Sequence, residues 1–95
     1  MTDSELCKLI QTDPEQGHKA LYETYVKYVY AIIFRILREI GSPEDIEDCL
    51  VETFSDVILH LGSIEGGQYK SYIGQSARNR ALNYYNVLRR QKEHL

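Results

Sequence analysis

The chain has 95 residues, of which 43% are hydrophobic and 26% are charged, so it is predicted to form one small domain. A chain of this length has room for one hydrophobic core and little room for a deep enclosed cleft, which argues against a two-domain enzyme. Its formal net charge of −3 at pH 7, taken alone, argues against nucleic acid as a partner.

The first half of the chain predicts two helices. A short one covers about residues 3–11. Asp13 and Pro14 then supply a capping acceptor and a proline suited to the first helical turn. The apolar pattern that follows continues without a break to Gly41, which predicts a second helix of roughly 27 residues.

The second half predicts two more helices separated by a glycine-rich loop. Ser42 and Pro43 repeat the start signal, which predicts a third helix over about 43–61. Residues 62–67 form the loop, and the helical pattern returns over about 68–92. No strand-like alternation competes with this pattern, so the predicted fold is an all-α bundle of three main helices plus a short N-terminal helix. Its expected core residues are Leu6, Leu9, Ile10, Leu21, Tyr25, Val29, Ile32, Ile33, Ile36, Leu37, Ile40, Ile46, Leu50, Phe54, Val57, Leu61, Ile73, Ala77, Ala81, Tyr84 and Leu88.

The charges are divided between the two parts of the chain. Residues 1–67 hold five Lys/Arg and thirteen Asp/Glu, whereas residues 68–95 hold six Lys/Arg and one Glu. The small net charge therefore hides an acidic part and a basic last helix. Such asymmetry indicates two different partners, one with a basic surface and one that is anionic.

The third helix carries a line of acidic residues. At 100° per residue, Asp45, Asp48, Glu52 and Asp56 share one line, and Leu59 continues it as an exposed apolar residue. Like charges at four-residue spacing repel each other, so helix stability alone does not favour them. The alternative is an ordinary solvated helix face.

The last helix carries a line of side-chain amides. Asparagine is a poor helix former, so three asparagines on one face, Asn79, Asn83 and Asn86, lower the stability of the helix. They also direct three side-chain amides outward. An amide both donates and accepts, which suits a base edge, while Arg and Lys bind phosphate and aromatic rings stack on unpaired bases. The alternative is an ordinary polar face with tyrosines at the edge of the core. The line and its flanks comprise Tyr69, Tyr72, Gln75, Ser76, Arg78, Asn79, Asn83, Tyr85, Asn86, Arg89 and Arg90.

Other chemistry has little support in the sequence. Cys7 and Cys49 lie far apart in apolar helical patterns, which favours a reducing compartment over a disulfide scaffold. His18, His60 and His94 have no ligand partners at metal-binding spacing. We find no nucleophile–base pair, secretory signal or membrane span. The expectation is a cytoplasmic protein that is not an enzyme and needs no metal or cofactor.

Two segments resemble a known family. Residues 47–54, EDCLVETF, resemble the E-D-x-[VL]-x-E-x-F helix of bacterial sigma factors. Residues 68–73, QYKSYI, followed by ARN at 77–79, are similar to their [FY]-[KR]-x-W-L and A-R-N segments. The order and spacing of these pieces around the glycine loop resemble region 2 of the sigma-70 family over about residues 14–92, closest to the small extracytoplasmic-function type.

The resemblance implies two partners and assigns residues to each. The long helix and the acidic helix would dock on the clamp helices of the RNA polymerase β′ subunit, with contacts from Asp45, Asp48, Glu52, Asp56 and Leu59. Residues 62–67 would help hold a base flipped from the promoter minus-ten element. The last helix would read and trap the non-template strand with Tyr69, Lys70, Tyr72, Arg78, Asn79, Asn83, Asn86, Arg89 and Arg90. An anti-sigma factor is a further candidate partner.

The sequence also departs from the family pattern. Tyr72 stands where the family usually has Trp, and Ser76 where an aliphatic residue is common. Asn83 and Asn86 stand where Asp and Arg are frequent. The chain stops where the family continues to region 4, so we expect an excised domain or a truncated member. The alternative function is a helical protein-interaction domain, a sigma-like co-regulator or antagonist that does not contact DNA.

Overall fold

The computed structural model describes residues 1–65 and 67–94. The described residues form four α-helices and one short 3₁₀ helix and contain no strand, which confirms the predicted all-α bundle. The helices are α1 (Asp3–Thr12), α2 (Pro14–Leu37), α3 (Pro43–Leu59) and α4 (Tyr69–Glu93), and the 3₁₀ helix η1 (Leu61–Ser63) follows α3.

Side-chain caps mark the predicted starts of α1, α2 and α3. The Ser42 hydroxyl accepts a hydrogen bond from the backbone N–H of Asp45 at 3.1 Å, and the Asp45 carboxylate accepts one from the Ser42 N–H at 2.8 Å. Thr2 and Glu5 form the same reciprocal box at the start of α1. Each box satisfies backbone donors that have no partner within the helix, and so fixes the residue at which the helix begins.

The predicted end of the second helix is wrong. α2 ends at Leu37 rather than near Gly41, and residues 38–41 form a turn. The Leu37 carbonyl accepts from the N–H of both Ile40, at 3.1 Å, and Gly41, at 2.7 Å. Because this turn still packs Ile40 against the core, the apolar pattern continues past the point where the helix stops. Periodicity therefore could not show the boundary.

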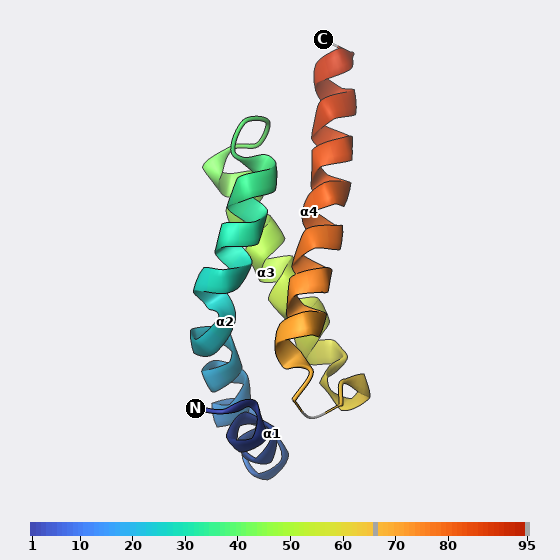
Figure 1. The fold of residues 1–95 in the computed structure, drawn as a ribbon. Helices are drawn as coiled ribbons and strands as arrows, with labels where there is room; N and C mark the ends of the chain where they lie inside the picture. The colour runs from blue at the N-terminus through green and yellow to red at the C-terminus, as the bar shows by residue number, and fades with distance from the viewer. Residues whose placement is uncertain (66, 95) are drawn as a thin grey trace.

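The core lies between α2, α3 and α4, with α1 packed across one end (Figure 1). The chain is elongated, with extents of 51 × 21 × 18 Å, and the last turns of α4 project beyond the other helices (Figure 1). Fully buried residues include Leu21, Val29, Ile33, Leu37 and Ile73. Several expected core residues are only partly buried, namely Leu9, Ile10, Ile32, Ile36, Ile40, Leu50, Tyr84 and Leu88.

The short helix α1 is attached to α2 by a close backbone approach. Gly17 is buried, and a Cβ atom at this position would lie 2.5 Å from the Ile10 Cα. The Tyr25 hydroxyl also donates a hydrogen bond of 2.5 Å to the Asp3 carboxylate. Glycine at position 17 therefore allows the two helices to meet.

We expect Gly17→Ala to lower the free energy of unfolding by about 1–3 kcal/mol, because the new methyl group forces the α1 backbone outward. This loss opposes the usual gain of about 1 kcal/mol when alanine replaces glycine in a helix. Urea unfolding followed by circular dichroism measures the change. Gly62→Ala is the control, since a Cβ atom at position 62 would have no atom within 4 Å other than those of Gly62 and its two chain neighbours. Equal stability of the two variants would contradict the packing argument.

Candidate functional site

A groove runs along the seam between α3 and α4. Its volume is about 270 Å³, and one wall is the α3 residue Asp56. The other wall consists of α4 residues that are mostly amides and hydroxyls: Tyr72, Gln75, Ser76, Asn79, Arg80 and Asn83. The amide line and the acidic line, expected to serve separate partners on different sides, therefore meet along this seam.

Asn79 is held in place within the groove. The Gln75 side-chain amide donates a 3.0 Å hydrogen bond to the Asn79 carbonyl oxygen, one helical turn away. This contact uses the Asn79 oxygen as an acceptor, and the Asn79 NH₂ group can still donate to a ligand. Both side chains are exposed, so a base edge has access to them.

Two of the hollows that adjoin the groove along α4 contain residues predicted to contact DNA. One, of about 660 Å³, lies between the loop after η1 and the start of α4, and Tyr72 and Gln75 line both it and the groove. The family resemblance implied that residues 62–67 help hold a flipped base; of these, Gly66 lies outside the described residues. The other hollow, of about 460 Å³, is lined by Asn83, Asn86, Val87, Arg89 and Arg90.

Two residues expected to face DNA lie elsewhere. Tyr69 is only 2% exposed and belongs to the core, and its burial raises the pKa of its hydroxyl to about 12. Its ring is therefore not available to stack on a base, which corrects that expectation. The Lys70 ammonium lies 5.2 Å from the centre of the Tyr28 ring, on the side of α4 that faces α2. Arg78 is exposed on the helix face about 100° from Asn79.

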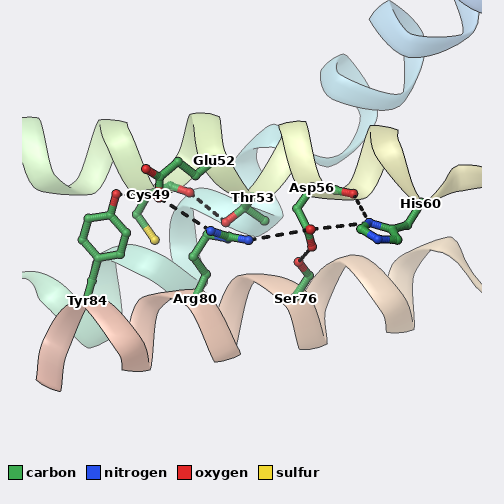
Figure 2. A network of polar contacts seen from close by, with 8 residues as sticks. All are labelled: Cys49, Glu52, Thr53, Asp56, His60, Ser76, Arg80 and Tyr84. Carbon is green, nitrogen blue, oxygen red and sulfur yellow. Dashed lines mark hydrogen bonds and ion pairs between the residues drawn. The ribbon is translucent and has the colours of Figure 1, made fainter. Parts of the chain in front are cut away.

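The acidic line of α3 is divided between solvent and α4. Asp48 is exposed, and Leu59 is 81% exposed. Asp45 is half-buried and takes part in the cap with Ser42. The carboxylates of Glu52 and Asp56 instead contact α4 (Figure 2). The line is therefore not a uniformly solvated face.

A polar network joins α3 to α4 through these carboxylates (Figure 2). The Tyr84 hydroxyl donates to Glu52 at 2.6 Å, and the Ser76 hydroxyl donates to Asp56 at 3.4 Å. Burial, with the Glu52 hydrogen bond as the next cause, raises the pKa of Tyr84, so its hydroxyl stays protonated as the donor. Arg80 lies between the two carboxylates, with its guanidinium nitrogens 3.7 Å from each.

Arg80 is the site residue that sequence reasoning missed. Ser76, Arg80 and Tyr84 follow one another at four-residue spacing on α4, opposite Glu52 and Asp56 at the same spacing on α3. The two matched lines were visible in the sequence. Their register was not, because it depends on how the two helices pack.

Among the described residues, the remaining reactive side chains form no organised centre. Burial is the main cause that raises the pKa of the Cys49 thiol to about 11, so it stays protonated at neutral pH. Residues 1–65 and 67–94 hold no group of three or more side chains arranged to bind a metal. Over those same residues, no helix has both the length and the apolar character needed to cross a bilayer.

Comparison with known proteins identifies the family. The family model described as Sigma-70 region 2 matches residues 21–92. The matched segment begins inside α2 and ends in the last turn of α4, so it contains both walls of the groove and leaves out α1. No curated protein and no solved structure gave a significant match. Since the family match covers most of its length, the chain belongs to the sigma-70 region 2 family, a domain of sigma factors that acts in transcription initiation.

Proposed function

We propose that this chain docks on core RNA polymerase through α3 and binds the single-stranded minus-ten element of a promoter with α4. The observation that carries the proposal is the groove in which Tyr72, Asn79 and Asn83 lie together beside the α3 seam. Family membership supports partners of this general kind, namely core polymerase and promoter DNA. A chain that binds core polymerase and promoter DNA in this way would act in the cytoplasm and would not be an enzyme.

The proposed DNA surface follows one edge of α4. Exposed amides read base edges, the half-buried Tyr72 stacks on a base, and arginines near the C-terminal end bind phosphate. The hollow beside the loop is the proposed place for an extruded base, since Tyr72 lies at its edge. The residues assigned to this surface are Tyr72, Asn79, Asn83, Asn86, Arg89 and Arg90, with Arg78 on the neighbouring face of the helix, while Lys70 lies on the side that faces α2.

The proposed polymerase surface is the outward side of α3. Asp48 has an exposed carboxylate, and Leu59 has an apolar side chain whose exposure to water is unfavourable and which a partner could cover. A basic helical partner such as the β′ clamp helices matches this combination. Asp45, Glu52 and Asp56 border it on the α4 side. Two points stay predictions: that the chain is of the extracytoplasmic-function type, and that an anti-sigma factor controls it.

Selection from a randomised pool of single-stranded DNA tests this proposal. We expect core polymerase carrying the chain to enrich one short motif, and core polymerase alone to enrich none. Asn79→Ala should reduce discrimination for that motif by about 1–3 kcal/mol, because the variant lacks the amide that reads a base.

Arg90→Gln is the matched control for Asn79→Ala. It should weaken binding to all sequences equally and reduce the salt dependence, as expected for a phosphate contact. Equal losses on all sequences for Asn79→Ala would remove Asn79 from a reading role. Capture of polymerase without any enriched DNA motif would instead favour the protein-interaction alternative.

A further inference from the structure

α4 carries a second exposed face, on the side that turns toward the end of α2. Leu82 and Tyr85 lie on it and are 45% and 36% exposed, although both side chains are large and mainly apolar. Three cations continue the face at alternating four- and three-residue steps, the spacing by which one helix packs along another. In chain order the face consists of Arg78, Leu82, Tyr85, Arg89 and Lys92, all of them exposed.

The surroundings of this α4 face are also basic. Arg35 and Arg38 of α2 line a hollow of about 390 Å³ together with Tyr85 and Lys92. Glu39 lines the same hollow and lies 4.0 Å from Arg38, but an exposed pair of this kind contributes little free energy. The α4 face therefore suits a helix that carries both carboxylates and apolar side chains.

The outward face of α3 has that chemistry and the same spacing. In chain order it consists of Glu44, Asp48, Val51, Ser55 and Leu59, all of them exposed. Val51 is 58% exposed and Leu59 is 81% exposed. The helix contains no lysine or arginine, so no cation within α3 neutralises the two carboxylates. The face is therefore acidic over its first half and mainly apolar over its second half.

The two faces match when the helices run antiparallel. The facing pairs are then Glu44 with Lys92, Asp48 with Arg89, Val51 with Tyr85, Ser55 with Leu82, and Leu59 with Arg78. Both carboxylates meet a cation in this register, whereas in the parallel register Asp48 meets Leu82. Antiparallel packing also brings the N-terminus of α3 to the C-terminus of α4, which the opposite partial charges of the two helix ends favour.

One chain cannot bring its own two faces together. α3 contacts α4 through Glu52 and Asp56, which lie on a different side of α3 from its outward face. α4 makes these contacts with Arg80 and Tyr84, on the side away from Leu82. Both faces therefore stay exposed in a single copy. The last turns of α4 project beyond the other helices, where a neighbouring helix has room (Figure 1).

We infer that the chain self-associates head to tail, with the outward face of α3 in one copy packed antiparallel on the exposed face of α4 in the next. Each copy keeps one free face of each kind, so the assembly adds further copies instead of stopping at a two-fold dimer. The inference goes beyond the proposed function. It uses the side of α3 that carries Asp48 and Leu59, so a copy that is docked on polymerase through this side cannot also offer it to a second copy.

Sedimentation equilibrium of the natural chain tests self-association. At about 1 mM chain and low salt, the weight-average mass should be at least about twice the 11.1 kDa of one copy, as expected for a Kd of about 1 mM or tighter. The mass should rise with concentration and should fall toward that of one copy at ~1 M salt, where the Debye length is about 3 Å. A mass that stays at one copy, or a plateau at two copies, would contradict the inference.

Charge reversal on each face separates this contact from non-specific association. E44K/D48K and R89E/K92E should each stay at the mass of one copy, because like charges then face each other. An equal mixture of the two variants should regain the mass of the natural chain, since the natural faces pair and so do the reversed faces. Circular dichroism checks that both variants remain helical.

E15K/E23K is the matched control for E44K/D48K, because it makes the same change in net charge at exposed positions of α2. We expect it to associate as the natural chain does. Equal association of E44K/D48K and this control, or a mixture of the reversed variants that stays at the mass of one copy, would show the inference to be wrong. Polymerase capture by dilute chain is measured separately, so failure of either proposal is recognised without the other.

Discussion

Asp48→Arg combined with Leu59→Arg is expected to weaken capture of core RNA polymerase by about 100-fold, equivalent to ~3 kcal/mol. The double change replaces a carboxylate and an apolar contact on the outward side of α3 with two cations, and like charges facing a basic partner cost several kcal/mol. Both positions are exposed, so the bundle should remain folded. Biolayer interferometry with immobilised chain measures the affinity, and circular dichroism measures the helix content.

Ser4→Arg combined with Glu15→Arg controls for the same change in net charge. Both residues are exposed, in α1 and in the first turn of α2, away from the α3 surface. We expect this pair to retain polymerase with an affinity within about threefold of the natural chain. Equal weakening by both pairs would show that net charge rather than the α3 surface governs docking.

Ile33→Ala is expected to lower the free energy of unfolding by about 2–5 kcal/mol. Ile33 is fully buried near the C-terminal end of α2, where removal of its side chain leaves a cavity that the surrounding helices fill only in part. That loss is a large share of the stability of a small domain, and it should lower the Tm by about 8 °C or more. Urea and thermal unfolding measure both quantities.

Val51→Ala is the matched control for this core variant. Val51 is also a β-branched residue within a helix, but it is 58% exposed, so we expect a change within about 0.5 kcal/mol. A similar small change for Ile33→Ala would contradict the burial that the fold requires at that position.

The helices themselves could be predicted from the sequence because their signals are local. Ser42 and Pro43 mark the start of α3 by chemistry that acts within one turn, and the structure has that cap. The end of α2 could not be predicted, since Ile40 keeps its contact with the core after the helix has stopped at Leu37. Apolar periodicity shows which residues face the core. A turn after the end of a helix can keep an apolar residue facing the core, so the periodicity continues past the helix end.

The candidate site could be predicted only as separate lines of residues. The amide line on α4 followed from helical spacing, and Asn79 and Asn83 do lie in one groove. The position of Glu52 against Arg80 depends on the register between α3 and α4, which local patterns do not contain. Tyr69 illustrates the same limit, because only the packed bundle shows that its ring is enclosed.

The central claim is that this domain brings single-stranded promoter DNA to core RNA polymerase. The most direct test measures retention of labelled non-template minus-ten DNA, carrying the motif selected from the randomised pool, on core polymerase with and without the chain. We predict retention only when the chain is present, with a steep loss as salt increases and with little retention of the template strand. Equal retention of DNA by core polymerase in the absence of the chain would contradict the claim.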